Sequence, residues 1–267
     1  MTRLAEYLEG RELTRSLVMR DIRGQYKGSV LGWFWSLLNP LTTVLIFSFL
    51  GSVLAIDAPV GDPSGLDSFV MHLVTGLVPW TFFAAAVTGA TGAIVGQGAL
   101  ITKVYFPRGV VVLAKVASLG FTALIEMAVA IAALLVVGNN VLPWLPVVVA
   151  LMVIQATFAL GIGLMLSVVN VYFRDVQYFL TLALQALFYT TPIVYPITLV
   201  SDRGEGLLRL YELNPLVAMV EAYRAALYNL RWPEVADVAY LSAWAVGSLL
   251  VGAWVFSRFE GRLAEEL

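Results

Sequence analysis

Long runs of apolar residues alternate with short polar segments along this 267-residue chain. A helix that crosses the hydrocarbon core of a bilayer, about 30 Å thick, needs roughly 20 mostly apolar residues. Segments that meet this requirement lie within residues 30–56, 70–97, 110–137, 143–169, 176–198 and 238–257. The third and fourth are separated by Gly138, Asn139, Asn140 and Pro143, which favour a tight turn. The pattern predicts an all-α integral membrane protein with six transmembrane helices.

The residues before the first apolar run predict a helix at the membrane surface. If residues 16–27 are helical, one face is basic and another is apolar. The basic face holds Arg20, Arg23 and Lys27, and the apolar face holds Val18, Ile22 and Tyr26. Leu13 and Leu17 do not fit this apolar stripe, so the amphipathic pattern is imperfect. A basic anchor to anionic lipids and a helix that also docks a cytoplasmic partner both fit.

The segment between the fifth and sixth apolar runs predicts a short external helix. Pro192 and Pro196, on either side of Tyr195, must break the preceding helix. Asn214 and Pro215 supply an N-cap and a proline at the first helical position. The residues that follow place Leu216, Val220, Tyr223 and Leu227 on one face and bring Glu221 within salt-bridge range of Arg224. An amphipathic helix on the outer surface, or a re-entrant element that dips into the bilayer, is expected.

The loop between the second and third apolar runs, residues 98–108, is unusually hydrophobic. Its apolar residues are Leu100, Ile101, Val104, Tyr105 and Phe106, and its cations are Lys103 and Arg108. Exposed apolar residues beside cations suit insertion into a groove of a partner protein. The alternative is that these side chains lie on the membrane surface.

Two apolar runs carry stripes of polar and aromatic residues. The fifth aligns Tyr178, Thr181, Gln185 and Phe188, with Tyr189 beside them; the first aligns Gly32, Ser36, Asn39 and Thr43, next to Trp35. Polar atoms in hydrocarbon need partners, so both stripes should face protein or a water-filled path. Ordinary hydrogen bonds between packed helices remain the alternative. Rings mixed with hydroxyl and amide groups would suit sugars.

Charge and composition fix the environment and the orientation. The chain is 60% hydrophobic and 13% charged, whereas soluble domains have about 45–50% apolar and about 25% charged residues. All but four of the 16 Lys and Arg residues lie in the termini, in the 98–109 and 170–175 loops or at Lys115. The positive-inside rule therefore places both termini in the cytoplasm. The first 30 residues carry too much charge for a signal peptide.

Several function classes are disfavoured. The chain has no cysteine, which excludes thiolate chemistry, and no GxxxxGK[ST] motif, so it has no P-loop of its own. No constellation suggests an enzyme or a metal site.

Glu126, the one acid well inside an apolar run, is interpreted as a structural hydrogen-bonding residue, with a proton site of an ion-coupled carrier as the alternative. His72 is interpreted as an interfacial residue. Gly92 with Gly96, and Ala159 with Gly163, permit close helix contact.

Five motifs occur in order along nearly the whole chain. They are Arg20-Asp21-Ile22-Arg23 with Tyr26, Gly28-Ser29, Leu31-Gly32, Trp35 and Leu38-Asn39-Pro40; Lys103-Val104-Tyr105-Phe106-Pro107-Arg108; Tyr172-Phe173-Arg174-Asp175-Val176; Thr191-Pro192-Ile193-Val194-Tyr195-Pro196; and Asn214-Pro215-Leu216. This ordered combination resembles the ABC-2 polysaccharide exporter permeases, the membrane subunits that export O-antigen, teichoic acid, capsule or cell-wall galactan.

The resemblance implies a single transmembrane domain over residues 1–267, with a cytoplasmic interfacial segment at 1–29, a six-span bundle at 30–257 and a cytoplasmic tail at 258–267. Two copies would pair in the bacterial cytoplasmic membrane around a channel for a lipid-linked polysaccharide. Each copy would rest on a separate ATPase subunit, which uses ATP and Mg²⁺ while this chain binds no cofactor. A drug or lipid as cargo, and an ion-coupled carrier that uses Glu126, are the competing interpretations. No nucleic-acid partner is expected.

The resemblance also assigns roles to residues. The surface that couples to the ATPase would comprise Arg20, Arg23, Lys27, Leu100, Lys103, Tyr105, Phe106 and Arg108. The substrate channel would be lined by Trp35, Ser36, Asn39, Thr43, Tyr178, Thr181, Gln185, Phe188 and Tyr189. An external re-entrant segment would be built around Pro192, Tyr195, Pro196, Asn214 and Pro215.

Overall fold

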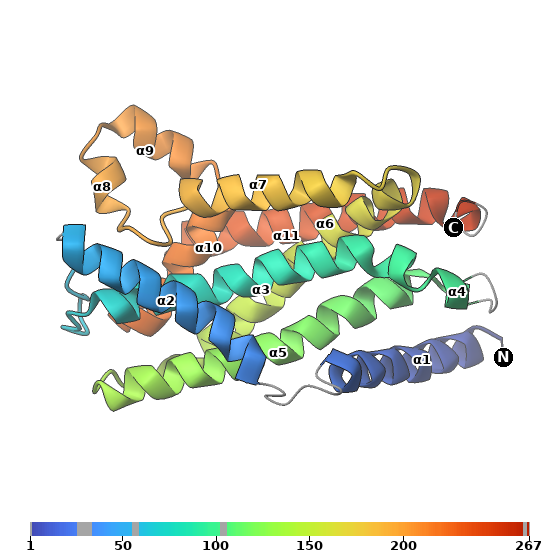
Figure 1. Ribbon diagram of the computed structural model, residues 1–267, viewed down its shortest axis with the longest axis horizontal. Helices are drawn as coiled ribbons and strands as arrows, with labels where there is room; N and C mark the ends of the chain where they lie inside the picture. Colours follow the sequence, from blue (N-terminus) through green and yellow to red (C-terminus); the bar gives the residue numbers. More distant parts are fainter. Residues whose placement is uncertain (1, 26–33, 55–58, 102–105, 264–265, 267) are drawn as a thin grey trace.

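The computed structural model describes residues 2–25, 34–54, 59–101, 106–263 and 266, and these residues form helices and loops without a β-strand (Figure 1). The helices are α1 (Thr2–Gln25), α2 (Phe34–Leu54), α3 (Phe69–Gly96), α4 (Gly98–Ile101), α5 (Gly109–Val136), η1 (Leu142–Trp144), α6 (Leu145–Tyr172), α7 (Val176–Thr190), α8 (Thr198–Ser201), α9 (Glu205–Glu212), α10 (Pro215–Arg224), the π-helical turn η2 (Ala225–Asn229), α11 (Val235–Phe259) and η3 (Glu260–Arg262). The all-α prediction is confirmed.

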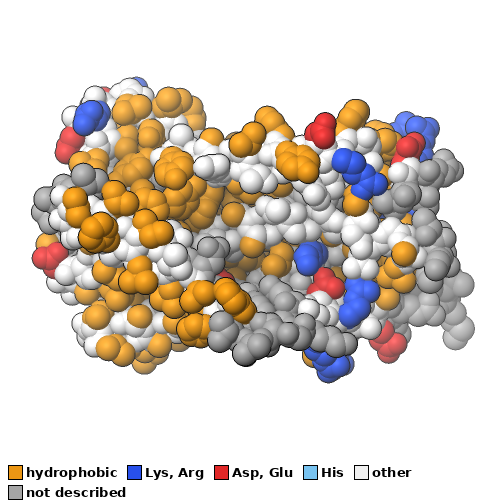
Figure 2. Space-filling view, viewed as in Figure 1, with side chains coloured by type: hydrophobic (Ala, Val, Ile, Leu, Met, Phe, Trp, Pro, Cys, Tyr) orange, Lys and Arg blue, Asp and Glu red, His pale blue; other side chains and the backbone are white. Residues whose placement is uncertain are grey.

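Four of the predicted spans are long helices. Among the described residues, the stretches Phe69–Gly96, Gly109–Val136, Leu142–Tyr172 and Val235–Arg262 are long and apolar enough to cross a membrane. They lie side by side along the long axis of the molecule (Figure 1). Charged side chains gather at the end that holds both termini and, at the opposite end, over α8 and α9, with a hydrophobic zone between (Figure 2). The chain is therefore a multi-pass membrane protein.

The first and fifth predicted spans contain shorter apolar helices. In α2 the apolar stretch is Pro40–Val53. Helix α7 has 15 residues, a length of about 22 Å at 1.5 Å per residue, which is less than the hydrocarbon core. It ends at Thr190, directly before Thr191 and Pro192, as the proline signal predicts. The described helices thus meet the length requirement in four of the six predicted spans.

Helix α3 is the centre of the bundle. It packs against α5, α6, α10, α2 and α7, and most of its residues are buried. Small residues allow the closest approaches. A Cβ atom on Gly163 of α6 would overlap the Cβ atom of Ala90 in α3, and one on Gly252 of α11 would overlap the carbonyl of Gly161 in α6. The close contact predicted at Gly163 is confirmed, and it meets α3; Ala159 is buried.

The predicted turn between the third and fourth spans is confirmed. Gly138 adopts a positive φ of 87°, a conformation that glycine accepts without steric cost. Asn139 is buried beside it, and its side-chain amide donates to the carbonyl oxygens of Leu227 at 2.8 Å and Tyr228 at 3.3 Å. The turn therefore does more than connect α5 and α6, because it also holds η2.

Helix α10 begins as predicted but is not amphipathic in the expected way. Asn214 caps it by accepting from the backbone N–H of Leu216 at 3.0 Å, with Pro215 at the first helical position. The predicted stripe from Leu216 to Leu227 is buried, but so are the residues between, including Val217 and Ala218. Helices α3, α6 and α11 surround α10. The expectation of a helix on the outer surface is wrong for α10, which lies inside the protein.

The N-terminal segment is helical as predicted, with a different buried face. Leu17 is 5% exposed, and Leu13 and Val18 pack against the same core. The apolar side of α1 is therefore centred on the two leucines that do not fit the predicted stripe. Helix α1 lies beside the N-terminal part of α5, at the end of the bundle where the C-terminus lies (Figure 1).

Candidate transport path and coupling surface

Most of the predicted channel stripe on α7 is exposed on the single chain. Tyr178 is 77% exposed and Tyr189 is 55% exposed, and Thr181 and Gln185 lie exposed between them. Thr181 donates its hydroxyl proton to the carbonyl of Gln177 in its own helix at 2.9 Å. An apolar helix thus presents aromatic rings, a hydroxyl and an amide away from its own bundle.

Phe188 departs from this exposed face. Its ring is half-buried, with its centroid 6.0 Å from that of Phe47 in α2 and 5.7 Å from that of Trp80 in α3. It also contacts Tyr189 edge to face at 5.2 Å. Phe188 therefore joins α7 to the bundle.

The predicted stripe on α2 is only partly described. Trp35 is 51% exposed and Thr43 is half-buried. Gly32 and the side chains of Ser36 and Asn39 lie outside the described residues.

The segment after α7 is fixed by polar contacts at the end of the molecule opposite the two termini (Figure 1). Tyr195 donates its hydroxyl proton to the carbonyl of Tyr189 at 2.9 Å, and the hydroxyls of Tyr195 and Tyr211 are 3.2 Å apart. Asn214 donates its amide to Thr191 at 3.1 Å.

Arg224 ties α10 to the same segment. Its side chain is buried, and it donates to the carboxylate of Glu221 at 2.9 Å and to the carbonyl of Ile193 at 2.8 Å. The predicted Glu221–Arg224 pair is confirmed. Pro192 and Pro196 are buried on either side of Ile193. The residues predicted for the external segment thus come together around α10.

Two buried polar residues form hydrogen bonds near α10 but were not predicted as site residues. Gln155 of α6 donates to the carbonyl of Pro79 at 2.6 Å and accepts the hydroxyl proton of Tyr223 at 2.8 Å. Tyr228 donates to the carbonyl of Pro59 at 3.1 Å and accepts the backbone N–H of Ser68 at 3.3 Å. An isolated glutamine within an apolar run is a signal that could have identified Gln155, since such a group needs a partner.

His72 is buried by protein, so its interpretation as an interfacial residue is wrong. It is 4% exposed, and its ring packs edge to face on Tyr228 with centroids 5.2 Å apart. Neither ring nitrogen has a hydrogen-bond partner among the described residues. The π-helical turn that follows α10 places Tyr228 over the histidine.

Glu126 makes the structural contact preferred from the sequence. Its carboxyl accepts a hydrogen bond from the hydroxyl of Thr81 at 3.2 Å, which joins α5 to α3. Within the described ranges, no three His, Asp or Glu side chains converge in a way that could hold a metal ion.

The predicted coupling loop is more buried than expected. Ile101 is 4% exposed, because the turn of α4 directs it into the core, and Leu100 and Phe106 pack partly buried against that core. The expectation that Ile101 is exposed is therefore wrong. Arg108 bonds to Glu260 of η3 through both its backbone N–H, at 2.6 Å, and its guanidinium. On α1, Arg20 and Arg23 are exposed. Lys27, Lys103 and Tyr105 lie outside the described residues.

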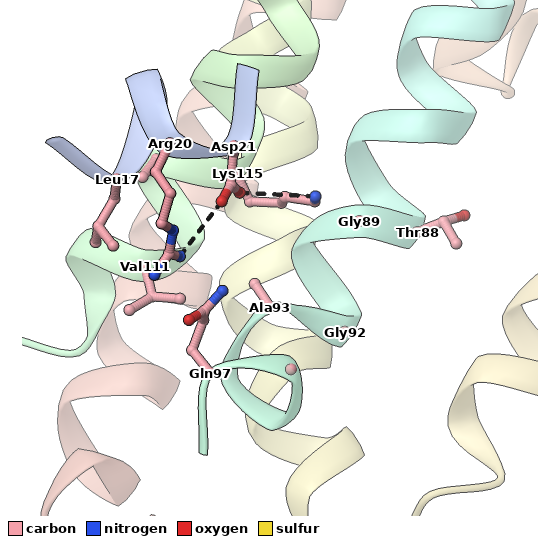
Figure 3. Close-up of a pocket in the computed structure, with 12 residues that line it drawn as sticks. Leu17, Arg20, Asp21, Thr88, Gly89, Gly92, Ala93, Gln97, Val111 and Lys115 are labelled. Carbon is pink, nitrogen blue, oxygen red and sulfur yellow. Dashed lines mark hydrogen bonds and ion pairs between the residues drawn. The ribbon is translucent and has the colours of Figure 1, made fainter. Parts of the chain in front are cut away.

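A cavity of about 250 Å³ lies between α1, α3 and α5, and we call it the α1 cavity (Figure 3). It is lined by Arg20 and Asp21 from α1, by Lys115 from α5 and by Gln97 at the end of α3, with further apolar and small residues. Asp21 accepts a hydrogen bond from Arg20 at 3.3 Å and lies 3.7 Å from the ammonium of Lys115.

Comparison with known proteins identifies the family. Residues 12–228 match the family described as ABC-2 type transporter. The O-antigen export system permease protein RfbA of Myxococcus xanthus is 32% identical over 98% of each chain, and a protein of that name from Klebsiella pneumoniae is 30% identical over 93% of this chain and 92% of that one. The polysialic acid transport protein KpsM of Escherichia coli is 26% identical over 89% of each chain. With this family match and four long apolar helices among the described residues, the chain belongs to the ABC-2 type transporter family.

Proposed function

We propose that this chain is the membrane subunit of an ATP-driven exporter that moves a lipid-linked polysaccharide across the bacterial cytoplasmic membrane. Two copies would work with two separate ATPase subunits, which bind ATP and Mg²⁺, since the chain carries no P-loop. The likeness to one O-antigen export permease extends over 98% of both chains, so it is not confined to one part of the chain. The main observation behind the proposed mechanism is the exposed face of α7, which presents polar and aromatic side chains.

The exposed face of α7 supports a channel between two copies. Tyr178, Thr181, Gln185 and Tyr189 lie on an otherwise apolar helix and are exposed in one chain. Facing lipid, the amide of Gln185 would lose its hydrogen bonds, which is unfavourable in hydrocarbon. Facing a second copy across a wet path, it keeps them. The rings can stack on sugar faces while the hydroxyl and amide bind sugar hydroxyls, and Trp35, Ser36, Asn39 and Thr43 of α2 would complete the wall.

The proposed topology has six spans in a single domain over residues 1–267. Helices α2 and α7 would complete the set, with both termini in the cytoplasm, because most Lys and Arg residues gather at that end. The short α7 would be extended across the outer half of the membrane by the buried segment around Ile193 and by α10. Irregular backbone at membrane depth is tolerated where protein surrounds it, as it does here. This segment would be the external re-entrant element.

The proposed coupling surface lies at the end that holds both termini. Arg20 and Arg23 are exposed on α1, and Lys27 and the 98–108 loop, with Leu100, Lys103, Tyr105, Phe106 and Arg108, would complete the surface that rests on the ATPase. Arg108 also bonds to Glu260, which directly follows α11, so a shift of this loop would move the end of α11.

Charge reversal tests the docking surface without disturbing the fold. Arg23→Glu is expected to prevent co-purification of the ATPase and to abolish export. Arg203→Glu makes the same charge change at an exposed position near α8, at the opposite end of the molecule, and should leave both unchanged. Retention of the ATPase by the Arg23 variant would remove α1 from the docking surface.

Depletion of the chain tests the cargo. A strain that loses this permease should accumulate polyprenyl-linked glycan on the cytoplasmic side, measured by extraction and mass spectrometry of the lipid-linked pool. An unchanged pool would exclude a polysaccharide and favour export of a drug or a lipid.

A further inference from the structure

The α1 cavity brings charges from separate helices together at the end of the bundle that holds both termini. Figure 3 shows Arg20 and Asp21 on α1 facing Lys115 of α5, with Gln97 extending toward the same space from the end of α3. The side chain of Asp21 is 19% exposed and that of Lys115 is 37% exposed. Asp21 is therefore largely withdrawn from water, whereas the side chain of Arg20 is 49% exposed. Electrostatic interactions are stronger where water is partly excluded than at an open surface.

The cationic donors of this cluster are largely unused. Within the described part of the chain, the guanidinium of Arg20 makes one hydrogen bond, to Asp21 at 3.3 Å. The ammonium of Lys115 is 3.7 Å from the same carboxylate, beyond hydrogen-bond distance, and no other described group accepts its protons. Arginine has five N–H donors and lysine has three. Two cations against one carboxylate leave a net charge of +1 and several free donors that point into the cavity.

The rest of the cavity suits the glycerol region of a lipid, between the headgroup and the acyl chains. Leu17, Val111 and Ala93 give it apolar walls, while a Cβ atom on Gly96 would meet nothing within 4 Å, so the helix end leaves open space there. Gly89 leaves room for the stem of Lys115, whose Cε atom would lie 3.3 Å from a Cβ at that position. A volume of about 250 Å³ exceeds the roughly 30 Å³ that one water occupies and falls below that of a drug-sized pocket.

We propose that the α1 cavity binds the phosphodiester headgroup of a bilayer phospholipid. A phosphodiester carries one negative charge, which matches the net charge of the cluster, and its oxygens accept the free donors of Arg20 and Lys115. The site lies where apolar spans give way to charged residues, which is the depth of the headgroups. The glycerol and the first methylene groups contact the apolar walls, and the acyl chains run outward along the spans.

A bound lipid would join α1 to the spans. Asp21 and Lys115 already form one bridge between α1 and α5, and a phosphodiester held by Arg20 and Lys115 adds a second. The position of α1 then depends on the lipid composition of the membrane. This consequence for coupling rests on the proposed docking role of α1, but the lipid site itself does not.

Binding of phosphatidylglycerol to the purified full chain tests the proposal, with bound lipid counted by native mass spectrometry during titration. One cation near a membrane surface contributes about 1 kcal/mol, or about fivefold in affinity. Lys115→Gln and Arg20→Gln should each weaken the tightest site about fivefold. Lys115→Arg should retain it. Asp21→Asn should tighten it about fivefold, because the competing carboxylate is gone. Arg258→Gln, an exposed cation at the same end outside the cavity, is the control and should change nothing.

Three results would overturn the proposal. If Asp21→Asn weakens binding as much as Lys115→Gln, the cluster is only an ion-pair brace between α1 and α5. If diacylglycerol, which has the same tails without the phosphate, binds as tightly as phosphatidylglycerol, the charges do not recognise the headgroup. If inorganic phosphate displaces the lipid at equal concentration, the site takes a free anion. Thermal unfolding of each variant, measured in parallel, separates loss of binding from loss of fold.

Discussion

Arg224 and Gln155 are polar side chains enclosed by apolar helices, and each connects separate elements. Gln155 of α6 bonds to Pro79 of α3 and to Tyr223 of α10, while Arg224 bonds to Ile193 in the segment after α7. A buried polar group without a partner costs about 1–3 kcal/mol, so each of these bonds is more costly to break than a surface contact. These hydrogen bonds attach α10 to α6 and to the segment after α7, in addition to its apolar packing.

Replacement of Arg224 by leucine should destabilise the chain by about 3 kcal/mol, because Glu221 and the carbonyl of Ile193 lose their partner in a buried setting. Arg209→Leu removes a pair of similar spacing, but Arg209 and Glu205 are 79% and 90% exposed, so its effect should be close to zero. Thermal unfolding in detergent gives both values. The double variant Arg224→Leu with Glu221→Leu should recover part of the loss. Equal effects of the two arginine substitutions would contradict this account.

At the scale of helices, two backbones can approach closely only where a residue has no side chain, as at a glycine. Gly252 of α11 lies against the backbone of Gly161 in α6, and the two helices share an extensive contact. A few residues further toward the start of α11, Gly247 has open space around it. The two glycines therefore belong to the same helix but occupy opposite environments.

Gly252→Ala should force α6 and α11 apart and destabilise the chain by about 1–3 kcal/mol, as overpacking does in a close-packed interior. Gly247→Ala is the matched control, since its new methyl group meets no atom within 4 Å. It should be neutral or slightly stabilising, because alanine is the better helix former. The fraction of monodisperse protein after heating, read by size-exclusion chromatography, distinguishes them. A neutral Gly252→Ala variant would show that the α6–α11 contact can relax.

Helix starts and turns could be predicted because their causes are local. Gly138 and Asn139 encode the α5–α6 turn, and Asn214 with Pro215 encodes the start of α10. Which face of an element is buried depends on neighbours distant in sequence. Ile101 lies in a loop that the sequence predicts to be exposed, but α4 turns it into the core. Periodicity predicts an apolar stripe on α10, yet the helix is buried on all sides because α3, α6 and α11 surround it.

At the scale of the molecule, the sequence predicts a polar and aromatic channel face on α7. The 3.6-residue period places Tyr178, Thr181 and Gln185 together, and the structure leaves them exposed. Phe188 has the same spacing but packs inward, because Phe47 and Trp80 offer it aromatic contacts. The spacing of residues in the sequence identifies which of them share a helix face. Whether a particular residue on that face packs inward or stays exposed depends on its neighbours in the fold.

The exposed face of α7 should be wet if two copies enclose a channel. Because the chain has no cysteine, single cysteines report on their surroundings without a background signal. Gln185→Cys in the complex with the ATPase should react with a water-soluble maleimide at least about tenfold faster than Leu124→Cys. Leu124 is a matched control, 50% exposed near the middle of α5 and expected to face lipid, where apolar surroundings disfavour the reactive thiolate. Polysaccharide held in the channel should protect Cys at position 185 but not at 124. Equal and slow labelling at both positions would place α7 against lipid and move the path to another face of the bundle.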